Sequence, residues 1–273
     1  MSVERLHRPT AREVDRAIAG HRPAIFSGLM DEQPAARWDL PSLRQRLGTR
    51  AVPVVCNGGP RISWDPRKGL SQRSLPFAEF ADRLVGRGGD AFEYLQDDVN
   101  DVPVLKADYR LPDCLGARAI LREKLWLGGG GLITPLHYDP VETFHWIIRG
   151  AKRFLCYRPG VLRYYPYPAR SDAPFISQVD PDHPRPREFP RFRAAVPVEF
   201  TLRAGEVLYL PAFWWHQVYS QAAVNLSLNF VWFAAPARNA RHFLQYLRAR
   251  RHIARGRARA RQAAARAASE GGA

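Results

Sequence analysis

GLITPLHYD, residues 131–139, decides the fold, because it reads as a strand that carries two potential metal ligands. Alternate side chains of a strand share one face, so His137 and Asp139 are expected side by side. An imidazole and a carboxylate so placed supply two of the three ligands of the facial triad that leaves iron(II) with open positions. Taken alone, the pair is better explained by a solvated strand edge or a histidine–aspartate hydrogen bond.

The best candidate for a third ligand is His216, which ends the stretch GEVLYLPAFWWH over residues 205–216. This stretch is a turn followed by an apolar strand. The next apolar run, Val224–Phe233, predicts a neighbouring strand that holds His216 in place. The sequence thus offers the three metal and catalytic residues His137, Asp139 and His216.

Around these residues, short strands alternate with glycine or proline turns, a pattern typical of a double-sheet cupin jelly roll. The predicted strands are Lys124–Leu127, Leu132–Tyr138, Thr143–Ile148, Arg153–Tyr157, Val198–Leu202, Val207–Leu210, His216–Ser220 and Val224–Trp232. A proline-rich insert, residues 159–197, lacks apolar periodicity and is expected to be a functional loop. The predicted jelly-roll core spans residues 121–235.

Residues 1–120 predict a mixed α/β flank. Its expected helices cover residues 10–19, 40–47 and 77–85, with Thr10 and Asp39 as caps, and its strands cover 23–26, 51–56 and 92–96. The polar piece up to about Gly116 is expected to be connection. Residues 236–255 predict a C-terminal helix with an apolar stripe that includes Leu244 and Leu247, and residues 256–273 predict a mobile basic tail.

Several strings, in this order and spacing, resemble the Jumonji C (JmjC) family of iron(II)- and 2-oxoglutarate-dependent oxygenases, cupin-like branch. They are TPLHYD (134–139), RGAKRF (149–154), YPYP (165–168), SQVD (177–180), GEVLYLPAFWWH (205–216) and LNF (228–230). PAIFSG (23–28), Trp38 and FEYLQDD (92–98) fit more weakly. The nearest likeness is to the asparaginyl hydroxylase that inhibits hypoxia-inducible factor. In that enzyme helices after the jelly roll form a dimer, so a homodimer is expected here.

The resemblance implies iron(II) and 2-oxoglutarate as cofactors and assigns four cofactor-binding residues. Lys152 is expected to bind the far carboxylate of 2-oxoglutarate; it is one of only 4 lysines against 37 arginines. Thr134 and Tyr94 match residues that meet the same carboxylate, and Asn229 matches an asparagine near the metal. The alternatives are an exposed hairpin lysine, an ordinary strand threonine, a core tyrosine and a strand amide bonded to a neighbour.

The substrate residues that the resemblance points to are Gln96, Phe175 and Ile176. Gln96 matches a substrate-side glutamine. Phe175 and Ile176 stand where the asparaginyl hydroxylase grips an amide with polar side chains, so the target is not expected to be an asparagine amide. Thr143 and His145 also depart from that enzyme, and His145 is interpreted as a neighbour of the metal and not a ligand.

Composition restricts the setting of the protein. The formal net charge is +15, and ten arginines lie between Ala237 and Ala273. This tail is expected either to attract nucleic acid or an acidic partner, or only to aid solubility. Three widely spaced cysteines suggest neither disulfides nor a zinc ribbon, and no apolar run is long enough for a membrane span or signal peptide. A cytoplasmic protein is expected.

These observations predict an iron(II)- and 2-oxoglutarate-dependent dioxygenase that hydroxylates a C–H bond, with a protein side chain as the first choice of substrate. Hydroxylation of an RNA base or a small molecule is the alternative within enzymes. From a different class comes a non-catalytic cupin binding module, against which the intact triad, Lys152 and Thr134 argue.

Overall fold

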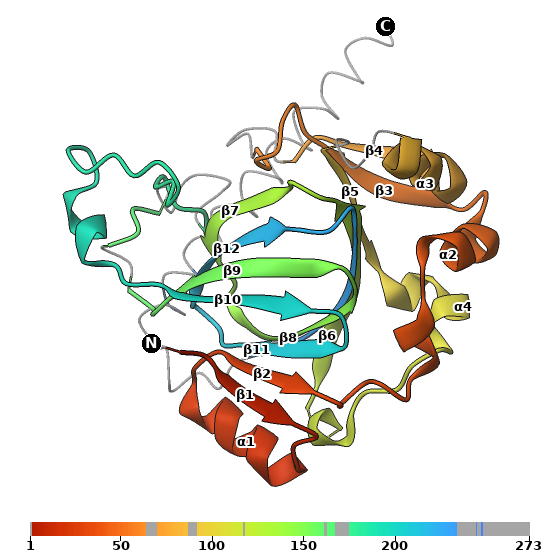
Figure 1. Cartoon of the computed structure of the whole chain (residues 1–273), viewed down its shortest axis with the longest axis horizontal. Helices are drawn as coiled ribbons and strands as arrows, with labels where there is room; N and C mark the ends of the chain where they lie inside the picture. Colours follow the sequence, from red (N-terminus) through yellow and green to blue (C-terminus); the bar gives the residue numbers. More distant parts are fainter. Residues whose placement is uncertain are drawn as a thin grey trace, which may run out of the picture.

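The structure is a computed structural model that describes residues 2–63, 70–86, 92–116, 118–160, 163–166 and 175–233, together with Leu244 and Leu247. Two sheets form its centre (Figure 1). The larger has the order β1-β2-β11-β8-β13-β6-β5-β3-β4, and the smaller β10-β9-β12-β7. The strands are β1 Glu4–His7, β2 Ala24–Ser27, β3 Ala51–Cys56, β4 Gln72–Pro76, β5 Glu93–Asp98, β6 Ile120–Gly129, β7 Ile133–Tyr138, β8 Val141–Arg149, β9 Ala151–Tyr157, β10 Val198–Arg203, β11 Glu206–Leu210, β12 Trp215–Ser220 and β13 Val224–Phe233.

The eight strands β6–β13 confirm the predicted jelly roll, because each corresponds to one predicted strand. In Figure 1 the four strands of the smaller sheet lie in front of β6, β8 and β11 of the larger one. An apolar cluster between the sheets includes Ile147, Phe154 and Leu208. Burying such side chains contributes about 1.5–3 kcal/mol each. The polar site described below adjoins this cluster, since the rings of Phe154 and His145 touch with centroids 5.7 Å apart.

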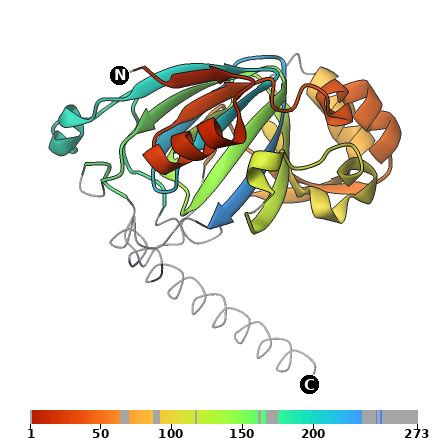
Figure 2. The same cartoon turned by 90° about the horizontal axis from the view of Figure 1, so that it is seen from below.

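The flank joins the jelly roll through its strands. β2 pairs antiparallel with β11, and β5 pairs antiparallel with β6, so both extend the larger sheet. Helices pack on the outer side of that sheet (Figure 2) and bury alternate residues of β8 such as Phe144 and Trp146. The helices are α1 Ala11–Gly20, α2 Leu40–Leu47, α3 Phe77–Gly86 and α4 Pro103–Lys106, with 3-10 turns η1 Pro34–Arg37, η2 Val99–Asp101, η3 Asp113–Leu115 and η4 Pro190–Ala194.

The predicted helix caps are present. Thr10 forms a capping box with Glu13, and Asp39 accepts from the backbone N–H of Ser42 at 2.8 Å. Other expectations for the flank were incomplete: β1 and β4 were not predicted, and the piece expected to be plain connection contains η2, α4 and η3. Both missed strands lie at the ends of the larger sheet, where pairing with a neighbour supplies what their short polar sequences do not.

Two turn glycines allow a test of this packing. Gly150, between β8 and β9, has φ +82°, and a Cβ there would lie 2.5 Å from the carbonyl oxygen of Val224. Gly131, between β6 and β7, has φ +73° with nothing within 4 Å of a Cβ. Both alanine variants should lose about 1–3 kcal/mol to backbone strain. Gly150→Ala should lose clearly more, because it also displaces backbone. Urea unfolding measures the difference, and equal losses would contradict this packing.

The predicted C-terminal helix lies outside the described residues except for Leu244 and Leu247, both of which are helical. The basic tail 256–273 and the second half of the YPYP string also lie outside them. The boundaries at residues 120 and 235 stay predictions. Within the described residues, no helix is long and apolar enough to cross a membrane.

Candidate active site

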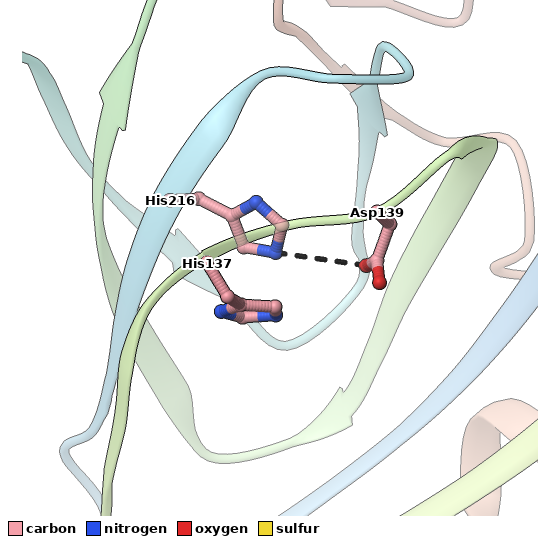
Figure 3. A group of neighbouring side chains, drawn as sticks. All are labelled: His137, Asp139 and His216. Carbon is pink, nitrogen blue, oxygen red and sulfur yellow. Dashed lines mark ion pairs between the residues drawn. The ribbon is translucent and has the colours of Figure 1, made fainter. Parts of the chain in front are cut away.

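Three side chains converge in the interior of the jelly roll as potential metal ligands: His137, Asp139 and His216 (Figure 3). One ligand atom from each lies within 4.8 Å of the others. The two imidazole rings have centroids 4.1 Å apart, and Nε2 of His216 lies 3.7 Å from Oδ2 of Asp139. The structure therefore brings together the residues that the sequence singled out as a triad.

Strand pairing positions the two histidines. β7 and β12 run antiparallel, and His137 stands directly opposite His216, beside a register shift between His216 and Val218. β7 ends at Tyr138, as the predicted strand Leu132–Tyr138 does, so Asp139 lies just after the strand and not within it. Its backbone oxygen instead accepts a hydrogen bond of 2.7 Å from the N–H of Phe213. The carboxylate reaches the histidines from the connection that follows the strand.

Hydrogen bonds to the backbone set the tautomer of both histidines. Nδ1 of His137 lies 2.8 Å from the carbonyl oxygen of Pro135, and Nδ1 of His216 lies 3.0 Å from that of Trp214. A carbonyl oxygen only accepts, so each Nδ1 carries the proton and each Nε2 keeps its lone pair. Burial and, to a lesser extent, the neighbouring His137 lower the pKa of His216 to about 3, against an opposing effect of Asp139.

These observations fit a transition-metal ion. Two neutral imidazole nitrogens and one carboxylate oxygen are the donor set of the iron(II) facial triad, which leaves open positions for other ligands. The two backbone carbonyls hold the rings in orientation, as the partners of metal-bound histidines do. The side chain of Asp139 is 48% exposed, so the site also opens to solvent on its carboxylate side.

A small cavity of about 40 Å³ brings together three of the predicted cofactor-binding residues. Tyr94, Thr134 and Lys152 all line it. Residues that sequence reasoning did not single out complete the lining: Ile62, Trp126, Leu127, Gly128, Leu132, Ser220 and Asn225. Trp126 and Gly128 lie two residues apart on the same face of β6. Strand alternation therefore places both on the cavity side.

Lys152 is buried and carries no carboxylate partner among the ion pairs of the described residues. Its Nζ donates to Oγ of Ser227 at 3.0 Å and lies 3.4 Å from Nε2 of His145. Burial lowers the pKa of Lys152 to about 7. A buried ammonium without a counter-ion is unfavourable, so this cavity suits a ligand that brings a carboxylate.

His145 and Asn229 lie on neighbouring strands, directly opposite each other in the β8–β13 pair. Burial holds the pKa of His145 well below its usual value, and the nearby Lys152 and His216 add to the effect. His145 is not one of the clustered metal ligands, in agreement with its interpretation as a neighbour of the metal. The predicted role of Asn229 stays a prediction.

The predicted substrate residues flank this site. Gln96 stands opposite Trp126 in the β5–β6 pair, and the ring of Trp126 stacks on Tyr94 with centroids 5.7 Å apart. On the other side Ile176 forms a bridge to His137. The ring of Phe175 meets the edge of Tyr138 with centroids 5.7 Å apart. The insert thus adds an apolar wall beside β7.

The chain is similar to proteins of known family. Residues 9–239 match the cupin-like domain family. Lysine-specific demethylase 8 of Xenopus tropicalis is 29% identical over 243 residues, which cover 85% of this chain and 53% of that protein. The human bifunctional peptidase and (3S)-lysyl hydroxylase JMJD7 is 27% identical, with 78% of each chain covered. The tRNA wybutosine-synthesizing protein 5 of Gallus gallus is 26% identical over 79% of this chain and 71% of that protein. The chain spans about half the length of the demethylase relative.

Proposed function

The chain belongs to the cupin-like domain family of JmjC oxygenases, which use iron(II) and 2-oxoglutarate, and from this premise we propose that it hydroxylates a C–H bond of a protein side chain. The family expected from the sequence is confirmed. The nearness to the asparaginyl hydroxylase stays a prediction. One observation carries the proposal: the triad lies in the same interior as the buried Lys152, which has no carboxylate partner among the residues that the structure describes.

His137, Asp139 and His216 would hold the iron through two Nε2 atoms and one carboxylate oxygen. When bound, iron(II) and 2-oxoglutarate would supply the oxidising chemistry, with succinate and CO₂ as co-products and one atom of O₂ in the new hydroxyl group. The contribution of the protein would be to orient these groups, and the burial that lowers the pKa of His216 favours the neutral imidazole that binds a metal.

Lys152 would bind the far carboxylate of 2-oxoglutarate, with Thr134 and Tyr94 as hydroxyl donors in the same cavity. The cavity is narrow and buried, so a compact ammonium fits it better than a guanidinium group would. Tyr94 and the stacked Trp126 would keep water away from this end of the co-substrate.

A protein substrate is supported by two kinds of observation. The names of two relatives describe action on lysine, as a lysine-specific demethylase and a lysyl hydroxylase. The wall of Phe175 and Ile176 suits apolar contact with a peptide, which Gln96 would orient with a hydrogen bond. The name of a third relative describes tRNA modification, which keeps an RNA base as the competing substrate.

Succinate formation in the presence of two substrate pools separates these alternatives. The iron-loaded protein is incubated with 2-oxoglutarate and either random heptapeptides or random RNA hexanucleotides, with Asp139→Ala as the inactive control. We expect stimulation by the peptides alone. Stimulation by RNA alone would transfer the proposal to an RNA base, and no succinate under any condition would favour a non-catalytic binding module.

We further propose a homodimer formed through residues 236–255. Leu244 is exposed in the described structure, and Leu247 is partly buried. The binding of nucleic acid or an acidic partner to the arginine-rich tail, and the cytoplasmic location, stay predictions from the sequence.

A further inference from the structure

Lys124 lies on the face of β6 that looks into the jelly roll. Alternation along the strand places it on the same side as Trp126 and Gly128, both of which line the cavity. Its backbone stands opposite Asp98 on β5 and Asn229 on β13. Lys124 therefore lies on the same face as the cavity, two residues along β6 from Trp126, which lines it.

The side chain of Lys124 interacts electrostatically with one of the metal ligands. The carboxylate of Asp139 attracts its ammonium group, although the two do not form an ion pair. The Nζ atom also lies 5.7 Å from the centroid of the Trp126 ring. The ammonium group of Lys124 thus lies beside the Trp126 ring and within electrostatic reach of Asp139.

Within the part of the chain that the structure describes, the side chain of Lys124 forms no hydrogen bond and no ion pair, whereas its backbone pairs with β5 and β13. Of the other two lysines that the structure describes, Lys106 pairs with Glu123, and Lys152 donates a hydrogen bond to Ser227 but has no carboxylate partner there. The carboxylate of Asp98 also attracts the ammonium group of Lys124, but the two form no ion pair, and Oδ1 of Asp98 accepts from the backbone and side-chain nitrogens of Asn100 at 3.1 and 3.0 Å.

The attraction to Asp139 would weaken in the iron-loaded protein, since that carboxylate would then be committed to the metal. A half-buried ammonium without an acceptor is costly, and acceptors for such groups are normally supplied by protein, water or ligand. The location beside Trp126, on the face of β6 that lines the cavity, points to the substrate as the source.

We propose that Lys124 is a specificity-determining residue that binds a carboxylate of the protein substrate, so that an aspartate or glutamate is the hydroxylated residue or its immediate neighbour. This rests on the proposed function. A lysine target is disfavoured, because two ammonium groups would repel each other in a half-buried site. The chain therefore differs in substrate from the relatives whose names specify lysine.

A single carboxylate fits the surroundings better than the phosphates of RNA. A polyanion is bound by several cations along its path. Here the strand next to Lys124 carries the acidic pair Asp97 and Asp98, which would repel a chain of phosphates. One carboxylate can meet Lys124 while the rest of the peptide lies against the apolar wall.

Peptide binding without oxygen tests the proposal. Three labelled heptapeptide pools share all positions except a central Asp, Asn or Lys, and their affinities are measured with iron(II) and 2-oxoglutarate present. We expect the wild type to bind the Asp pool roughly tenfold more tightly than the Asn pool, the gain of one charge-assisted hydrogen bond. Lys124→Met should abolish this preference, and Lys124→Glu should shift it to the Lys pool.

Arg122→Gln is the matched control, because Arg122 is an exposed cation on the same strand face two residues away, and it should keep the Asp preference. Equal affinity of the wild type for the Asp and Asn pools overturns the proposal, as does binding of no pool or a preference that survives in Lys124→Met. RNA that binds through Lys124 in place of peptide would also overturn it. Succinate formation by the wild type is measured separately. If succinate forms, a negative binding result contradicts the role of Lys124 and not the oxygenase function.

Discussion

Asp139→Ala and His216→Ala are each expected to lower iron affinity and succinate formation by roughly 100-fold or more, since removing even the outer partners of metal ligands costs 10–100-fold. The reason is that each variant leaves only two of the three converging ligands. The fold should persist, because Asp139 lies after the end of β7 and its side chain is 48% exposed. Anaerobic cobalt(II) titration, followed by visible absorption, measures metal affinity independently of turnover.

The matched control is His183→Ala, since His183 is an exposed histidine of the insert that pairs only with Asp180. It should bind metal like the wild type. Circular dichroism and urea unfolding establish that the ligand variants are folded. Folded variants of both Asp139 and His216 with undiminished cobalt affinity would refute the triad.

Lys152→Met is expected to weaken 2-oxoglutarate binding with little change in iron affinity. Losing a charge-assisted pair costs about 1.5–3 kcal/mol, which corresponds to roughly a 10- to 100-fold higher Kd. Methionine keeps the length of the side chain without the charge. Calorimetric titration of the iron-loaded protein without oxygen gives the Kd. Arg153→Met is the control, because Arg153 is the next residue of β9 and pairs instead with Glu199.

The affinity for 2-oxoglutarate should also depend on pH. Burial lowers the pKa of Lys152 to about 7, so the ammonium form that binds a carboxylate becomes scarcer as the pH rises above 7. The apparent Kd for 2-oxoglutarate should therefore rise by up to about tenfold per pH unit above 7 in the wild type. In Lys152→Met this dependence should be absent. A wild-type Kd that stays flat between pH 7 and 8.5 would argue against Lys152 as the anchor.

The eight jelly-roll strands could be predicted because their signals are local. Apolar alternation and glycine or proline turns mark each of them, and the turn at Gly150 needs a positive φ. β1 and β4 carry no such signal: Glu4–His7 and Gln72–Pro76 are short and mostly polar, and they become strands through pairing with β2 and β3. Their formation depends on tertiary contacts.

In the active site, too, some features follow from local sequence and others depend on tertiary contacts. His137 and His216 could be paired from the sequence, because family motifs mark both, and the end of the predicted strand Leu132–Tyr138 coincides with the end of β7. The contacts of Lys152 with Ser227 and His145 depend on how the two sheets face each other, which no local pattern encodes. Lys124 was missed for a similar reason: that its ammonium group forms no ion pair with the described residues is visible only when its neighbours are in place.

The central claim is that this chain is an iron(II)- and 2-oxoglutarate-dependent oxygenase, and succinate production tests it most directly. The wild-type protein is incubated in air with 2-oxoglutarate, with iron(II) or with a chelator, and succinate is quantified by mass spectrometry beside the Asp139→Ala variant. The account predicts several equivalents of succinate per protein chain with iron(II), and background amounts with chelator or in the variant. Background amounts from folded wild-type protein that binds both iron(II) and 2-oxoglutarate would contradict it.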